Sequence, residues 1–180
     1  MKKDILILFA VFVLAAALIM GTDFQTVDEY YLTHNDDVTP DSQTVTISVS
    51  CEAVLDAWDK LDPALSSGGY IPEDGIMVEE TVCVLRPGDT VFDILYRTLV
   101  GEKIQFEYQG AEKNAFGTVY VQGIGYLYEN DCGSYSGWTY KVNDSYPDVG
   151  CSDYKLSDGD RIQWIYVCSV DEMFSGGDGE

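Results

Sequence analysis

The chain has 180 residues, 46% of them hydrophobic and 13% aromatic, which suffices for one ordinary domain with extensions and a sizeable core. Its 31 acidic residues face only 10 Lys and Arg residues, and the net charge of −21 excludes nucleic acid and anionic lipid headgroups as partners. The single histidine, His34, precedes the expected domain, which excludes a histidine-dependent catalytic triad and a histidine-based zinc site within it.

The N-terminus predicts export. Two lysines precede an almost unbroken apolar run over residues 5–21, longer than the apolar part of a usual signal peptide and slightly short for a membrane span. Positive residues before such a run place the N-terminus in the cytoplasm and the rest outside. We predict a signal or anchor segment at residues 1–21 and favour an uncleaved anchor over a cleaved signal. The protein is then secreted or held at the extracellular face of the membrane.

The next residues have the composition of a spacer. Residues 22–43 contain many acidic side chains and no Lys or Arg, so we expect a negatively charged stalk. At the other end, the acidic, Gly-rich residues 169–180 predict a disordered tail. The folded domain is therefore expected at residues 44–168.

Within the domain, strict alternation of apolar and polar residues at 44–50 predicts a first strand, and residues 78–85 predict a second. Between them, residues 52–75 read as irregular apart from a short helical piece at the start. A turn at 86–89 leads into a helix that ends at Gly101. Four further strands are expected at 104–108, 117–123, 138–142 and 161–167.

This order of elements predicts an α+β fold. If the first strand lies beside the last, the sheet is mixed and grasps the one main helix, which is a β-grasp-like arrangement. The sequence does not fix the strand order.

Five cysteines in an exported chain favour disulfides, and none of their spacings is that of a metal site. Cys83 lies in an alternating apolar run where a buried thiol packs like a hydrophobic side chain, so we predict that it is free. Cys51 and Cys168 each end a strand and can pair if those strands are parallel neighbours. Cys132 and Cys151 flank the same strand, and a bond between them would clip its two connections. We therefore expect a disulfide-clipped sheet.

Several short sequence motifs along the domain are similar to those of one known family. They are YIPEDG at 70–75, PGDTVFDIL at 87–95, VQGI at 121–124, LYE at 127–129, CG at 132–133, SGWTYKVN at 136–143, YKLSDGD at 154–160 and WIY at 164–166. Together they resemble the transcobalamin C-terminal-like domain family, DUF4430, over residues 44–168, as an exported bacterial member. The resemblance implies a β-grasp-type ligand-binding domain. It also implies a corrinoid as a candidate ligand, since the similar domain of animal cobalamin carriers closes over cobalamin.

Aromatic side chains are the candidate ligand contacts, because they offer large rigid surfaces with hydrogen-bonding tips that suit a flat ligand. The candidates are Tyr126, Tyr128, Trp138, Tyr140 and Tyr146. The alternative for Trp138 is a place in the core, and for Tyr140 a cross-strand pair.

The acidic loops do not single out a catalytic or metal-binding group. Asp158, Gly159 and Asp160 form a turn sequence, and the EF-hand calcium pattern is missing. Every loop is acidic, so no carboxylate pair stands out as catalytic. We predict no enzymatic activity and no metal site.

The sequence thus favours an extracellular, membrane-tethered module that binds a small soluble ligand, with a corrinoid as a candidate, and that passes the ligand to a membrane transporter. The alternative is a cell-surface domain that binds protein or glycan through an aromatic edge, without a small-molecule ligand. A third interpretation is a calcium-stabilised stalk.

Overall fold

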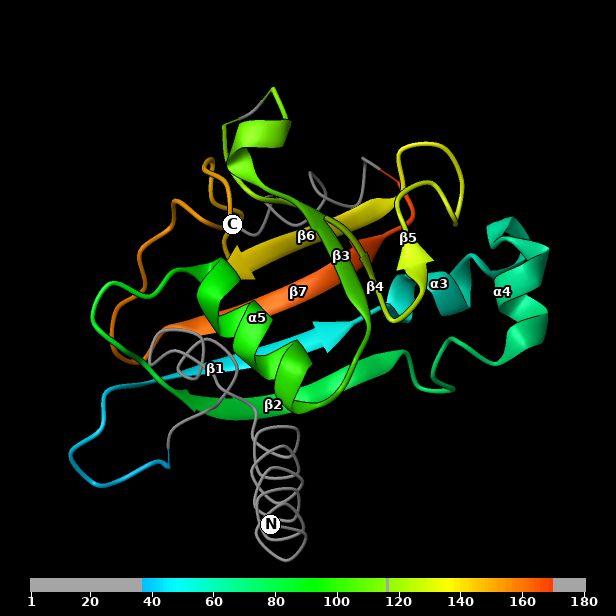
Figure 1. Ribbon diagram of the computed structural model, residues 1–180. Coiled ribbons are helices and arrows are strands. Elements are labelled where there is room, and N and C mark those ends of the chain that lie inside the picture. Colours follow the sequence, from blue (N-terminus) through cyan, green and yellow to red (C-terminus); the bar gives the residue numbers. More distant parts are fainter. Residues whose placement is uncertain (1–36, 116, 170–180) are drawn as a thin grey trace, which may run out of the picture. The chain divides into compact units, whose positions relative to one another are not determined.

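The computed structural model describes residues 37–115 and 117–169 (Figure 1). The expected segment 1–21, His34, most of the acidic stretch 22–43 and the tail beyond residue 169 lie outside the described residues. Among the residues that are described, no helix is both long and apolar enough to cross a membrane.

The main sheet has four strands: β1 (Thr44–Ser50), β2 (Ile76–Val84), β6 (Gly137–Val142) and β7 (Arg161–Val167). They lie in the order β2-β1-β7-β6, and only the central pair is parallel, with Ile47 of β1 opposite Ile162 of β7. The first strand therefore lies beside the last and the sheet is mixed, which settles the strand order that the sequence left open.

The helix α5 (Val91–Gly101) lies across one face of this sheet (Figure 1). A second sheet, of β3 (Phe106–Gln109), β4 (Tyr120–Ile124) and β5 (Leu127–Tyr128), contributes buried residues to the same core. The α+β class predicted from the sequence is confirmed.

The start of α5 shows how local sequence determines the element. The Thr90 side chain accepts a hydrogen bond from the Asp93 N–H at 3.2 Å, and the Asp93 carboxylate accepts one from the Thr90 N–H at 2.8 Å. This reciprocal capping box satisfies two backbone donors that a helix N-terminus leaves free. The apolar face that follows, with Val91, Ile94 and Leu95 fully buried, is the reason that the helix packs on the sheet.

The segment between β1 and β2 is more regular than predicted. It holds α3 (Glu52–Asp56), the 3-10 turn η1 (Trp58–Lys60) and α4 (Pro63–Gly68). The last of these was not expected. It forms because Asp62 caps the Ala64 N–H and Pro63 stands in the first helical turn, where a missing N–H has no cost.

The predicted disulfides are not present. All five cysteines are buried, and no two of them, among the described residues, lie at the distance of a disulfide bond. In the parallel register, Ser50 is paired with Ile165. The next residue, Cys51, is therefore opposite Tyr166, two residues before Cys168. Cys132 belongs to a core cluster around α3 and Tyr166, whereas Cys151 belongs to the cluster under α5, which keeps these two sulfurs apart.

Candidate functional site

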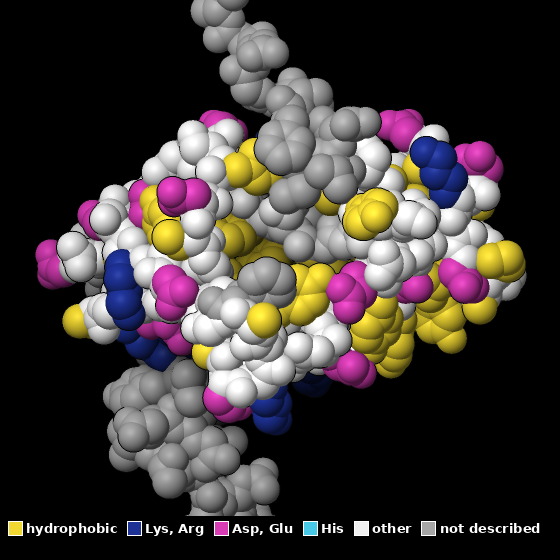
Figure 2. Space-filling model, turned by 90° about the horizontal axis from the view of Figure 1, so that it is seen from above, with side chains coloured by type: hydrophobic (Ala, Val, Ile, Leu, Met, Phe, Trp, Pro, Cys, Tyr) yellow, Lys and Arg dark blue, Asp and Glu magenta, His cyan; other side chains and the backbone are white. Residues whose placement is uncertain are grey.

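A cavity of about 600 Å³ opens beside β6, the edge strand of the main sheet. Its walls come from β6, from the beginning of β4 with the two residues before it, and from the loop over residues 147–153; one side chain of β7 completes it. Hydrophobic side chains gather in a hollow of the face that Figure 2 shows, with acidic side chains scattered around it. The residues that line the cavity are Thr118, Val119, Tyr120, Val121, Trp138, Thr139, Tyr140, Pro147, Asp148, Val149, Gly150, Cys151, Asp153 and Trp164.

Aromatic rings make up much of the wall. Tyr140 of β6 is paired with Trp164 of β7, and their ring centroids are 5.5 Å apart. Tyr154 meets the Tyr140 ring edge-on at 6.5 Å. Because Tyr140 and Trp164 are 8% and 3% exposed, their orientation is set by the core behind them, and the wall is preformed.

The polar tips of two wall residues are already engaged. The Tyr140 hydroxyl donates to the Val149 carbonyl at 2.6 Å, and the Trp138 indole N–H donates to the Leu127 carbonyl at 2.9 Å. Burial raises the pKa of Tyr140 well above its usual range, and nearby Cys151 and carboxylates add to the effect, so the phenol stays neutral. These two side chains therefore offer ring surface to a ligand and use their donors to hold the wall.

Trp164 differs from them. Its indole Nε1 is the one buried side-chain nitrogen or oxygen, among the residues that the structure describes, without a hydrogen-bond partner. Leaving a buried donor unpaired costs about 1–3 kcal/mol, and such groups are rare in native proteins. The orphaned donor belongs to a residue that lines the cavity.

The loop over residues 147–153 is held against its neighbours at several points. The Cys151 carbonyl accepts a hydrogen bond from the Phe92 N–H at the start of α5, at 3.0 Å. On the other side, the Ser152 hydroxyl accepts from the Val119 N–H at 3.0 Å and contacts the Thr118 hydroxyl at 2.7 Å. The cavity wall is thus tied both to the helix and to the small sheet.

The charge around the cavity is negative. The exposed Asp148 and Asp153 line it, and no Lys, Arg or His is among the described residues that line it. The hydroxyl of Tyr120 donates to the Glu129 carboxylate at 2.5 Å, which brings a third acid close to the wall. Carboxylates in its lining make the cavity unfavourable for an anion.

Only two of the five predicted contact residues, Trp138 and Tyr140, lie at this cavity. Tyr126 is at the tip of the β4–β5 connection, beside a separate hollow of about 380 Å³, where its ring lies 5.3 Å from that of Tyr70. Tyr128 is in β5, and its hydroxyl lies 2.9 Å from both Gln105 and Glu107. The sequence interpretation grouped side chains that the β4–β5 hairpin keeps apart.

Tyr146 lies at neither of these places. Its ring is 4.6 Å from the Lys141 ammonium group, in a cation–π contact beside a third hollow.

Sequence reasoning missed Tyr120 and Trp164. Both stand in alternating runs that predict strands, so they read as structural residues. The pairing of β6 with β7 was the missing information, because it sets Trp164 beside Tyr140.

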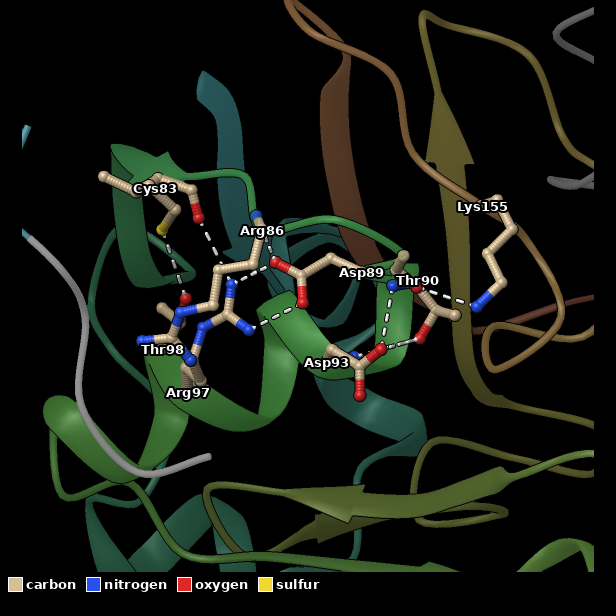
Figure 3. Close-up of polar contacts among 10 residues, drawn as sticks. Cys83, Arg86, Asp89, Thr90, Asp93, Arg97, Thr98 and Lys155 are labelled. Carbon is tan, nitrogen blue, oxygen red and sulfur yellow. Dashed lines mark hydrogen bonds and ion pairs between the residues drawn. The ribbon is translucent and has the colours of Figure 1, made fainter. Parts of the chain in front are cut away.

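Two of the motifs that resemble the family have a structural role. In the turn before α5, the buried Asp89 carboxylate accepts two hydrogen bonds from the Arg97 guanidinium, at 2.6 and 3.0 Å, and one from the Arg86 N–H at 2.8 Å (Figure 3). Arg97 and Asp89 are 2% and 10% exposed, so neither charge tolerates the loss of its partner.

In the Asp-Gly-Asp motif, Asp158 accepts the Thr44 N–H at 2.8 Å, Asp160 accepts the Ser157 N–H at 2.8 Å, and Gly159 has a φ of 83°. The prediction that Asp158, Gly159 and Asp160 form a turn is confirmed.

A second group of aromatic side chains lies on the surface between α5 and β3. Four rings, with neighbouring centroids 4.9 to 6.2 Å apart, form this aromatic cluster: Phe92, Tyr96, Phe106 and Tyr108. Tyr108 is the most open of them, at 42% exposed.

No group of His, Cys, Asp and Glu able to hold a metal ion occurs in the part of the chain that the structure describes. Residues 88–167 match the model of a family described as a domain of unknown function, DUF4430. The match begins in the turn before α5, ends with β7 and contains every residue that lines the cavity. No curated protein is similar enough to the chain to match it.

Proposed function

We propose that this chain, whose residues 88–167 belong to the DUF4430 family, is a ligand-binding module that holds a small molecule in the cavity beside β6. The observation that carries the proposal is the unpaired Trp164 donor in an aromatic wall. A cavity of about 600 Å³ lies within the range of roughly 300–1,000 Å³ that small-molecule sites occupy.

The ligand class follows from the wall. The rings of Trp138, Tyr140 and Trp164 suit a flat, largely apolar molecule. A hydrogen-bond acceptor on that molecule would pair with the indole N–H of Trp164, which has no partner. Asp148 and Asp153 favour a neutral or cationic ligand over an anionic one.

A corrinoid is the first candidate. Its macrocycle is flat and its rim carries amide carbonyls, which are acceptors of the kind that Trp164 lacks. The resemblance to the transcobalamin C-terminal-like domain points the same way. One edge of the ring would enter the cavity, and the rest would stay outside it.

The finer description of the fold that we propose is β-grasp-like. Its support is the order β2-β1-β7-β6, the parallel central pair and the single main helix across one face. The cavity lies beside β6, the edge strand of this sheet.

We also propose that the module works outside the cell, tethered through residues 1–21, and delivers its ligand to a membrane transporter. The apolar run after two lysines and the net charge of −21 support this placement. We assign it no enzymatic activity, no metal and no resident cofactor.

The proposal is tested by titrating the full-length chain, in detergent, with cyanocobalamin and dicyanocobinamide, followed by Trp fluorescence and calorimetry. We expect saturable binding of at least one probe at micromolar concentration or below. Tyr120→Ala, which opens one wall of the cavity, is expected to weaken binding at least about tenfold, as loss of an aromatic anchor does.

Tyr108→Ala is the matched control, because it removes the same side chain from the neighbouring strand, in the aromatic cluster. Binding that is lost with Tyr108 and kept with Tyr120 would move the site out of the cavity. The absence of binding by either probe would remove the corrinoid.

One observation favours a second candidate function, a cell-surface domain that binds protein or glycan. The aromatic cluster of Phe92, Tyr96, Phe106 and Tyr108 presents stacked and edge-on rings at the surface, the residue type that is enriched in interfaces. A partner bound there would respond to Tyr108→Ala and not to Tyr120→Ala, so the same two variants separate the two functions.

A further inference from the structure

Two buried sulfur atoms meet away from the cavity, where the loop before β6 reaches the end of β7. The Sγ atoms of Cys132 and Cys168 are 2.7 Å apart, and the residues are 0% and 4% exposed. Non-bonded heavy atoms pack at about 3.5–4.0 Å, whereas a disulfide bond is about 2.05 Å long. The two thiols are therefore much closer than packing alone requires.

We propose that Cys132 and Cys168 are a disulfide-forming pair, which closes in an oxidising compartment and fastens the loop over residues 129–136 to the end of the main sheet. The pairing differs from both disulfides expected from the sequence. It does not depend on the ligand-binding function proposed above.

The backbone around the pair is already fixed. The Cys132 N–H donates to the Ser136 hydroxyl at 3.1 Å, and the Asn130 N–H donates to the Ser136 carbonyl at 2.9 Å. The Ser136 hydroxyl also lies 2.9 Å from the Tyr166 hydroxyl of β7, two residues before Cys168. Both ends of the new bond are thus held in place before it forms.

Closing the bond leaves no buried group unpaired. The Cys132 thiol faces the Ala57 carbonyl at 3.6 Å and loses its hydrogen on oxidation. That carbonyl also accepts the Lys60 N–H at 2.8 Å, so it keeps a partner.

The sulfur–sulfur contact is what sets this pair apart from the other thiols. Cys51 shares the apolar cluster around α3, and burial, with Asp74 and Glu52 adding to it, raises the pKa of its thiol to about 12. Cys83 and Cys151 lie in the other core cluster, against Thr98 and the Val119 carbonyl respectively.

The reaction is thiol–disulfide exchange with a small disulfide such as oxidised glutathione. One protein thiol loses its proton and attacks the glutathione disulfide, which forms a mixed disulfide and releases one glutathione. The second thiol loses its proton and attacks the protein-bound sulfur, which forms the Cys132–Cys168 bond and releases the other glutathione. The protein pair gives up two electrons, and the glutathione disulfide takes them.

The test compares the full-length chain, in detergent, after equilibration with oxidised or with reduced glutathione. The oxidised protein is expected to lose two of its five thiols, and a non-reducing digest should link the peptides of Cys132 and Cys168. Its thermal midpoint is expected to rise by about 5–10 °C, because the bond closes a loop in the unfolded chain.

Cys168→Ala should abolish the difference in midpoint between the two redox states. Cys151→Ala, which truncates another buried thiol, should preserve it; comparing each variant with itself cancels the cost of the cavity. The proposal is overturned if all five thiols persist under oxidising conditions, if the digest links another pair, or if Cys168→Ala keeps the redox difference.

Discussion

The tyrosines of the cavity have a role beyond ring surface. Tyr140 and Tyr120 each donate a hydroxyl hydrogen, one to the Val149 carbonyl and one to the Glu129 carboxylate, so both must remain protonated. Burial, followed by the Glu129 hydrogen bond and charge, raises the pKa of Tyr120 from 10 to about 12. The two hydroxyls thereby help to hold the loop over residues 147–153 and strand β4, which both line the cavity.

The raised pKa of Tyr120 predicts a loss of stability in alkali. Between pH 10 and about 12 the unfolded chain ionises this phenol and the folded protein does not, so the free energy of unfolding falls as the pH rises. Below pH 10 this contribution is fully present. Tyr120→Phe should make the fall shallower in urea unfolding experiments at a series of pH values.

Tyr135→Phe is the control, because its side chain is 79% exposed and its hydroxyl can be removed without a change in the core. An equally steep alkaline fall in wild type and Tyr120→Phe would contradict the assigned environment of Tyr120.

At the scale of elements, the cavity is made where three segments meet: β6, the start of β4 and the loop over residues 147–153. The approach of the last two is close. A Cβ atom added to Gly150 would overlap the Thr118 side chain, so only glycine allows the loop to lie this near the strand.

Gly150→Ala is therefore expected to push the loop away from β4. Overpacking of this kind costs about 1–3 kcal/mol of unfolding free energy, measured by urea denaturation. Binding of the corrinoid probes should weaken in parallel, because Val149 and Asp148 move with the loop.

Gly137→Ala is the matched substitution, since a Cβ there meets Glu129 only at 3.8 Å, an ordinary contact. It should leave both stability and binding nearly unchanged. If Gly150→Ala also left the free energy of unfolding and probe binding unchanged, the position of the loop would not depend on its close approach to Thr118.

For the molecule as a whole, the elements were more predictable than the site. The strands around Ile47 and Ile162 and the helix over Ile94 were expected from periodicity, which reports burial on one face directly. Helix α4 was missed, because its Asp62 cap and Pro63 were read as loop residues.

The site depends on register and on loops, which periodicity does not report. Trp138 and Tyr140, which alternate along the edge strand β6, were proposed from the sequence and line the cavity, whereas the place of Trp164 beside Tyr140 follows only from the pairing of β6 with β7. Tyr126 was misplaced because the residues after β4 form a tight turn, with Tyr126 at a φ of 67°, that carries it to another hollow.

The most direct measurement is the indole N–H spectrum of the full-length chain, labelled with nitrogen-15 at its three tryptophans, during titration with dicyanocobinamide. We predict that the Trp164 signal moves furthest, because its unpaired N–H gains an acceptor, and that Trp138 shifts as a neighbouring wall residue. Trp58, 43% exposed on η1, should stay in place. Saturable binding that moves Trp58 and leaves Trp164 unchanged would contradict the assignment of the cavity beside β6 as the ligand site.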